Sequence, residues 1–211
     1  MTGLSTSPLV QKGAILALAP GSPSPTVVVV FQYNPNEITR DLKPNAGKEG
    51  GAPGEQLRLS GPPTETISIS IDIDAVDQLA LGDPNAAQYG IGPSLAALEL
   101  LLYPKSATAI ADAALGAAGM LEIVPQEAPL ALLSWNNNRI LPVRIETLNI
   151  DEQAFDANLN PIQATVKLSV RVLNYNDLGA GSEGGKMFLA QQIRLERMAG
   201  LGGFGAAARL P

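Results

Sequence analysis

Two stretches of strictly alternating apolar and polar residues constrain the fold of this chain more than any other feature. Every second residue is isoleucine in residues 65–74 (ETISISIDID), and residues 162–173 place five apolar side chains on one face: Ala164, Val166, Leu168, Val170 and Val172. Successive side chains of a β-strand point to opposite faces of a sheet, so this alternation indicates strands with one buried face. The sequence therefore predicts a mainly β protein with antiparallel strands.

Four further segments extend the strand pattern. Residues 14–18 and the β-branched run at residues 26–33 predict two strands near the N-terminus, and residues 130–135 and 139–155 predict two more. A turn rich in Asp, Asn and Pro at residues 156–161 joins the last two long strands into a hairpin. We expect an antiparallel sandwich or a partly closed barrel.

Two or three helices are expected beside the strands. Ser94 is placed to cap a helix that Pro104 ends, and an Ala-rich pattern predicts a second helix at residues 106–118. Residues 186–199 predict a third helix after a Gly-rich connector. This last helix begins a C-terminal arm.

The domain organisation follows from these elements. Residues 1–178 are expected to form one β domain with a helical insertion around residues 94–118, and residues 179–211 a helical arm with a Gly-rich tail. Residues 43–63 contain many Gly, Pro and charged residues and show no hydrophobic pattern. Because a loop of this length in a compact domain is usually functional, we expect a partner to order it.

The composition excludes several classes of function. The 211 residues include no Cys and no His, which removes thiol chemistry, His-dependent nucleophilic sites and ordinary zinc or haem sites. A net charge of −6 disfavours nucleic-acid binding, which needs a basic face. No apolar run approaches the length of about 18 residues that a membrane span requires. We expect no cofactor, no metal and assembly in the cytoplasm.

A carboxylate-dependent hydrolase is the enzymatic alternative, because an enzyme without His has to use carboxylates for proton transfer. Asp72 and Asp74 lie two residues apart on the polar face of one predicted strand, where they could act as a pair. A solvated strand end is the simpler interpretation of the same residues. A free carbohydrate-binding β-domain is a further alternative, although aromatic residues make up only 4% of the chain.

Three motifs occur in a characteristic order. Residues 31–38 (FQYNPNEI) break a strand at an Asn-Pro step, Trp135 follows an apolar pair, and residues 155–164 (FDANLNPIQA) form the hairpin turn. Together, over about residues 13–176, they are similar to the tube-type N-terminal domain of contractile injection systems, which are phage-tail-like particles. Two turn positions that are usually Gly in that family are Asn here, and Asn tolerates a positive φ.

The resemblance implies a structural protein without enzymatic activity. In such particles it would be a baseplate or tube adaptor that joins the inner tube or hub to neighbouring baseplate proteins, or alternatively a tube-end or terminator protein. The implied partners are tube, hub, spike, wedge or sheath subunits and copies of the chain itself in a ring. Many family members continue into a LysM module. Too few residues follow residue 176 for one, so peptidoglycan binding is not expected.

Two groups of residues are singled out as candidate sites. The family-pattern positions are expected to fix the fold more than to contact a partner, and they are Phe31, Tyr33, Asn34, Pro35, Trp135, Phe155 and Pro161. In the C-terminal arm, apolar side chains lie around more than one face of the predicted helix, which suggests contacts on two sides. The candidate partner-docking residues there are Phe188, Ile193, Leu195 and Met198.

Overall fold

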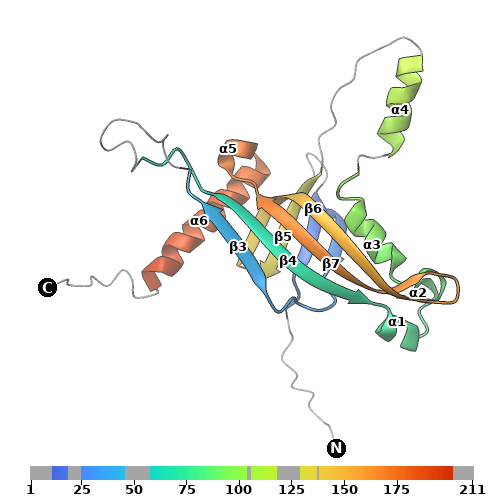
Figure 1. The fold of residues 1–211 in the computed structure, drawn as a ribbon. Coiled ribbons are helices and arrows are strands. Elements are labelled where there is room, and N and C mark those ends of the chain that lie inside the picture. Colours follow the sequence, from blue (N-terminus) through green and yellow to red (C-terminus); the bar gives the residue numbers. More distant parts are fainter. Residues whose placement is uncertain are drawn as a thin grey trace, which may run out of the picture.

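The computed structural model describes six stretches of the chain, namely residues 11–18, 25–45, 58–103, 106–117, 129–136 and 138–201. Seven strands within them form one sheet in the order β2-β1-β5-β6-β7-β4-β3 (Figure 1). Every pairing is antiparallel, and the sheet is not closed, so the predicted mainly β fold is confirmed. The strands are β1 Ala14–Leu18, β2 Pro25–Val30, β3 Ile38–Lys43, β4 Thr64–Asp74, β5 Leu130–Asn136, β6 Arg139–Phe155 and β7 Pro161–Val172.

Six helices lie within the described residues, where the sequence predicted two or three. They are α1 Val76–Ala80, α2 Pro84–Tyr89, α3 Gly92–Glu99, α4 Ser106–Ala117, α5 Tyr175–Leu178 and α6 Glu183–Leu201. The unpredicted helices are the short ones, and local capping explains two of them. The Asp83 carboxylate accepts the backbone N–H groups that begin α2, and Asn174 and Asp177 form a capping box around α5.

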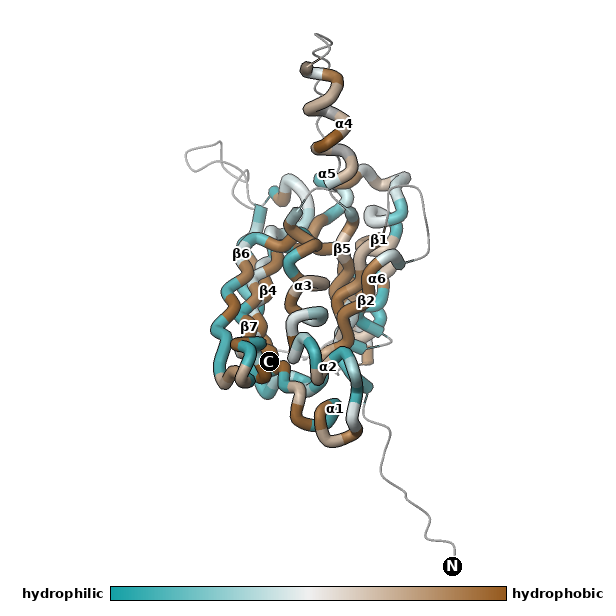
Figure 2. The backbone as a smooth tube through the Cα atoms, turned by 90° about the vertical axis from the view of Figure 1, so that its right-hand side faces the viewer, coloured by the Kyte–Doolittle hydropathy of each residue, from teal (hydrophilic) through white to brown (hydrophobic). Residues whose placement is uncertain are grey.

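Helix α3 fills the space between the two halves of the curled sheet. Figure 2 shows α3 with β4, β6 and β7 on one side and β1, β2 and β5 on the other. Leu95 and Leu98 of this helix belong to the same buried apolar cluster as residues from six of the strands. The inner face of the sheet and α3 therefore form one hydrophobic core. In contrast, α4 stands away from the sheet (Figure 1).

The alternating segments place their side chains as predicted. The isoleucines of β4 and the apolar residues of β7 are buried, and the two strands pair directly. In β6 the alternation is interrupted because Glu146 has no partner between the pairs of Ile145 and Thr147 with β7. This bulge moves the inward positions from Val143 and Ile145 to Leu148 and Ile150.

Strand β3 corrects the sequence analysis, which predicted no strand between residues 34 and 63. All six residues of β3 pair with residues 64–69 of β4, although five of the six are exposed. A strand at the edge of a sheet with charged side chains on both faces shows no alternation, so its sequence does not identify it. Residues 46–57 of the predicted loop lie outside the described residues, as does the Gly-rich tail at residues 202–211.

Candidate functional site

The FQYNP motif lies in the segment that connects the two edge strands of the sheet. Strands β2 and β3 stand at opposite ends of the strand order, yet only residues 31–37 separate them in the chain. This connecting segment therefore crosses the opening of the curled sheet, where the two halves approach each other. Its side chains therefore make the contacts that connect the two edges of the sheet.

Phe31 is the buried anchor of the connecting segment. Its ring is almost fully buried in the core, and its backbone N–H donates to the carbonyl of Gly13 at 2.8 Å. A Cβ atom added at Gly13 would lie 2.6 Å from Cδ2 of the Phe31 ring. The close approach of ring and backbone therefore requires glycine at position 13.

Asn34 ties the connecting segment to the residues that precede β1. Its side-chain oxygen accepts the Gly13 backbone N–H at 2.9 Å, and its side-chain nitrogen donates to the Gln11 carbonyl at 2.7 Å. Pro35, which has no backbone N–H, follows and stays half-buried. The motif thus uses its polar residues for contacts within the chain.

Gln32 and Asp74 join the two halves of the sheet by two hydrogen bonds. The Gln32 side-chain nitrogen donates to Asp74 Oδ1 at 3.3 Å, and the Asp74 backbone N–H donates to the Gln32 side-chain oxygen at 3.0 Å. Tyr33 is exposed beside them. The negative charge of Asp74, followed by desolvation and the charge of Asp77, raises the pKa of Tyr33 above its ordinary value of 10.0.

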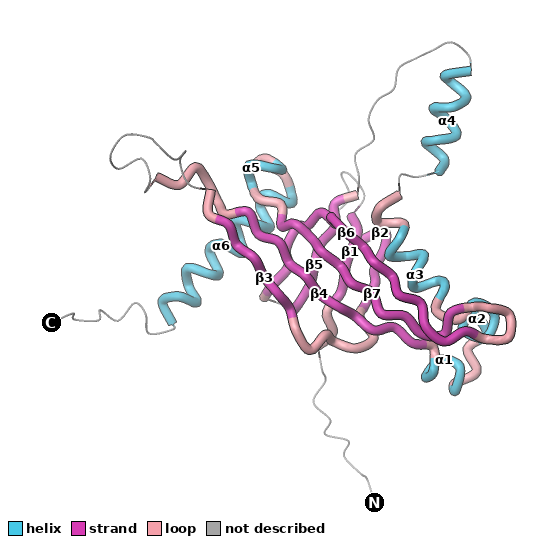
Figure 3. Tube along the Cα trace, in the orientation of Figure 1, coloured by secondary structure: helices cyan, strands magenta, loops and turns pink. Residues whose placement is uncertain are grey.

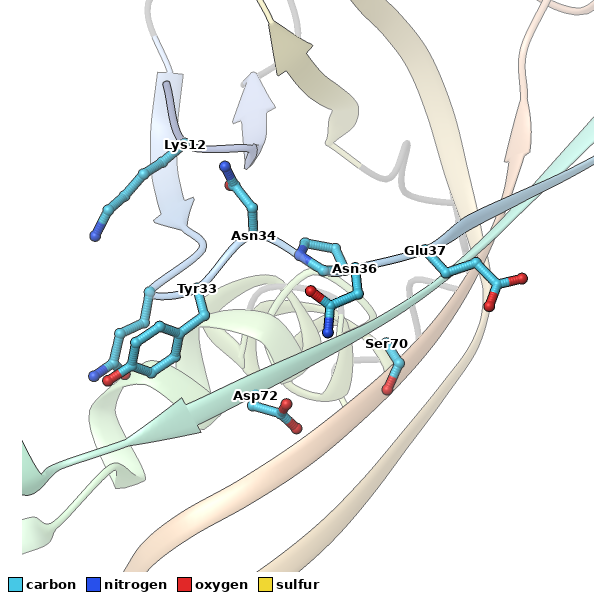
Figure 4. Close-up of a pocket in the computed structure, with 9 residues that line it drawn as sticks. Lys12, Tyr33, Asn34, Asn36, Glu37, Ser70 and Asp72 are labelled. Atoms are coloured by element: carbon cyan, nitrogen blue, oxygen red, sulfur yellow. The ribbon is translucent and has the colours of Figure 1, made fainter. Parts of the chain in front are cut away.

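A polar hollow of about 580 Å³ opens next to this junction. Figure 4 shows Lys12, Tyr33, Asn34, Asn36 and Glu37 around it, with Ser70 and Asp72 contributed by β4. The sequence had placed Asp72 and Asp74 as a possible acidic pair. Asp72 accepts the Thr165 hydroxyl at 2.9 Å, and Asp74 Oδ1 also accepts the Val76 backbone N–H at 3.1 Å. Both carboxylates thus connect neighbouring elements of the fold.

Asp156 organises the hairpin turn that the sequence singled out. Its carboxylate accepts the backbone N–H groups of Asn158 and Asn160 at 2.7 and 2.8 Å, and the side-chain nitrogen of Asn160 at 2.8 Å. The hydrogen bonds from the side chain and backbone of Asn160 hold the pKa of Asp156 below its ordinary value. The turn leaves Phe155 exposed and Pro161 half-buried.

The tip of this hairpin rests on the corner between α2 and α3 (Figure 3). The carbonyl of Pro161 accepts the Ile91 backbone N–H at 2.9 Å, and the Asn160 side chain donates to the Gln88 carbonyl at 3.0 Å. Gly90 has a φ of +58°, and a Cβ atom there would lie 2.0 Å from the Pro161 oxygen. Gly90 was not predicted from the sequence, because nothing local distinguishes it from other glycines.

Trp135 lies near the end of β5. It is half-buried against the core, and the turn that follows is closed by the Asn136 side chain, which accepts the Asn138 backbone N–H at 2.9 Å. Asn136 therefore supplies the turn with an Asx hydrogen bond.

The four candidate docking residues of the arm divide into two groups. Phe188 packs against the core and meets the ring of Tyr175 edge to face, with 5.9 Å between the ring centroids. Ile193, Leu195 and Met198 are exposed. The N-terminal half of α6 thus packs on its own domain, and the C-terminal half presents apolar side chains outward.

Phe188 and Leu195 also line a second hollow, of about 440 Å³, between α6, β3 and the residues that lead into β4. Arg40, Glu65 and Arg139 meet in it, so the arm forms one wall of a groove that contains charged side chains. The sequence analysis did not identify this groove, since its charged residues come from three strands far apart in the chain.

Within the part of the chain that the structure describes, no helix is long and apolar enough to cross a membrane. The same residues contain no group of three or more acidic side chains that could hold a metal ion. Comparison of the sequence with protein-family models and with characterised proteins found no match.

Proposed function

We propose that this chain is a structural component of a contractile phage-tail-like injection system, a baseplate or tube adaptor that joins the inner tube or hub to neighbouring baseplate proteins. The motifs over residues 13–176 support this proposal, as does the mainly β fold in which they lie. A tube-end or terminator protein of the same particle is the alternative position. In either position the chain acts by binding other subunits and copies of itself.

The single observation that carries the proposal is the unprotected edge of β2. This strand pairs with β1 on one side, and on its other side no strand pairs with it among the described residues. The last four of its six residues are valines, and Val28 and Val30 are 51% and 54% exposed. An exposed apolar edge without charged side chains readily pairs with another chain, so a protein that keeps one needs a partner to cover it.

The opposite edge differs in character. Strand β3 exposes Arg40, Asp41 and Lys43, which are charges of the kind that discourage unspecific pairing. Because six antiparallel pairings separate them, β2 and β3 run in the same direction. A contact between β2 of one copy and β3 of the next is heterologous and can close into a ring, whereas a contact between two β2 strands gives a two-fold dimer.

Substitution of one edge valine tests the proposal. Val28→Lys adds a charge to the β2 edge at an exposed position, so the monomer should keep its melting temperature while assembly is lost. Sedimentation velocity of the purified chain, alone and with co-expressed tube or hub subunits, measures the assembly. Leu81→Lys, at an exposed position away from both edge strands, is the matched control. Assembly that is equally strong in Val28→Lys, or no assembly of the parent chain under either condition, contradicts the proposal.

A further inference from the structure

The groove between α6, β3 and the start of β4 has the character of a binding site. Its volume of about 440 Å³ lies in the range of sites that bind small ligands, roughly 300–1,000 Å³. The walls combine apolar side chains with charged and amide groups, which are those of Arg40, Glu65, Arg139, Gln191 and Gln192. The apolar lining residues are Leu42, Leu59, Leu141, Phe188 and Leu195, with Tyr175 beside them.

The groove contains one more positive than negative charge. Arg40 Nε lies 2.6 Å from Glu65 Oε1, which makes this pair a close ion pair. Arg139 Nη2 lies 4.0 Å from the same oxygen, and it has no hydrogen-bond partner among the described residues. Two guanidinium groups therefore share one carboxylate, and the charge of Arg139 is only partly compensated.

The surroundings of Arg139 disfavour its charge. Burial lowers the pKa of Arg139 from its ordinary value, the charge of Arg40 lowers it further, and Glu65 opposes both effects. The side chain nevertheless keeps 20% of its surface accessible, and it lines the groove. A carboxylate brought into the groove would supply the negative charge that balances Arg139.

Gln191 provides a second unpaired group in the same groove. The residue is only 9% exposed, and its side-chain oxygen has no hydrogen-bond partner in the part of the chain that the structure describes. Buried polar atoms without a partner are rare because each has lost its water without gaining a protein contact. The two unpaired atoms, Arg139 Nη2 and Gln191 Oε1, are themselves shielded from solvent, so a ligand in the groove reaches Arg139 through the part of its side chain that stays accessible.

We propose that this groove binds an acidic segment of a partner protein in an extended conformation. An Asp or Glu side chain of that segment pairs with the accessible part of the Arg139 side chain. A neighbouring apolar side chain packs against Phe188 and Leu195. An acidic peptide segment supplies a carboxylate and an apolar side chain within a few atoms of each other, which matches a positive charge beside apolar walls. The inference does not depend on the β2 edge, so it can fail while the proposed function holds.

A blocked peptide provides the probe. Acetyl-Ser-Leu-Glu-Leu-Ser-amide carries one internal carboxylate between two leucines, and the same peptide with Gln in place of Glu removes only the charge. Each is titrated into the full chain while NMR follows the Arg139 side-chain Nε–H and the Gln191 side-chain amide. We expect the Glu peptide to shift both signals and the Gln peptide to bind at least about tenfold more weakly.

Variants assign the effect to Arg139. Arg139→Gln removes the charge and leaves Glu65 paired with Arg40, so the melting temperature should stay at or above that of the parent while binding of the Glu peptide falls at least about tenfold. Arg144→Gln, on the same strand at an exposed position outside the groove, is the matched control and should bind as the parent does. Leu195→Asp is a second variant, which keeps Arg139 and adds a negative charge to the wall; it should weaken binding similarly.

Four results would overturn the inference. They are equal binding of the Glu and Gln peptides, binding only of a peptide with a free C-terminal carboxylate, no shift of either signal at millimolar peptide, and unchanged binding in Leu195→Asp. A large fall in the melting temperature of Arg139→Gln would also count against it, because Arg139 would then be serving the fold.

Discussion

The placement of α3 inside the curled sheet predicts a large effect of one core substitution. Leu98 is completely buried, and its cluster joins α3 to both halves of the sheet. Leu→Ala at such a site removes the transfer free energy of the lost methyl groups and leaves a cavity, which together cost about 2–5 kcal/mol. Because the surrounding strands are held by their hydrogen bonds and can collapse only partly, we expect Leu98→Ala to lie in the upper half of that range.

Thermal and urea unfolding followed by circular dichroism measure this effect. For a chain of this size each kcal/mol lowers the melting temperature by about 2–4 °C, so a cost of about 3.5–5 kcal/mol lowers it by roughly 7–20 °C. Leu100→Ala is the control, since Leu100 is 60% exposed at the end of the same helix and its loss should cost no more than about 0.5 kcal/mol. Equal and small effects of the two substitutions would show that α3 does not fill the sheet, which would refute the reasoning.

Two other features of the fold make testable predictions. In urea unfolding, Gly90→Ala should destabilise the chain by at least about 2 kcal/mol more than Gly82→Ala. Both positions have a positive φ, but only a Cβ atom at Gly90 meets the Pro161 carbonyl. Similar losses of stability would contradict the docking of the hairpin tip. The pKa of Tyr33 is raised in the folded chain, so the protonated side chain contributes to the free energy of unfolding. This contribution is complete below a pH of about 10, and it is lost as the pH rises through the folded-state pKa. Absorbance titration should find that Asp74→Asn lowers this pKa, and an unchanged value would exclude Asp74 as the cause.

Periodicity predicted the central strands well because burial acts on one face of each. Strands β4 and β7 alternate without interruption, and their inward residues form the core of the structure. The bulge at Glu146 explains why β6 alternates imperfectly, since one extra residue exchanges the two faces of the strand. The sequence pattern shows that the inward face of the strand changes, but it does not show which residue lacks a partner in β7.

The elements that the sequence did not predict depend on contacts made in the folded chain. Strand β3 is stabilised by pairing with β4 and has no buried face of its own. Gly90 is required by a hairpin tip about 70 residues away in the chain. The groove at Arg139 combines residues of β3, β4, β6 and α6, and neither spacing nor composition brings these together. Its only local signal was the apolar content of the arm, which predicted Phe188 and Leu195 as docking residues.

We expect copies of this chain to assemble through a heterologous contact between β2 of one copy and β3 of the next, and site-directed crosslinking tests this contact most directly. The chain has no cysteine, so cysteines introduced at exposed positions of β2 and β3 report only the intended contact. Val28→Cys and Thr39→Cys proteins are mixed, treated with a short bismaleimide and separated on a denaturing gel. The account predicts a crosslinked product that needs both variants, and higher oligomers when one chain carries both cysteines. Dimers of Val28→Cys alone, or monomers in every mixture, would contradict it.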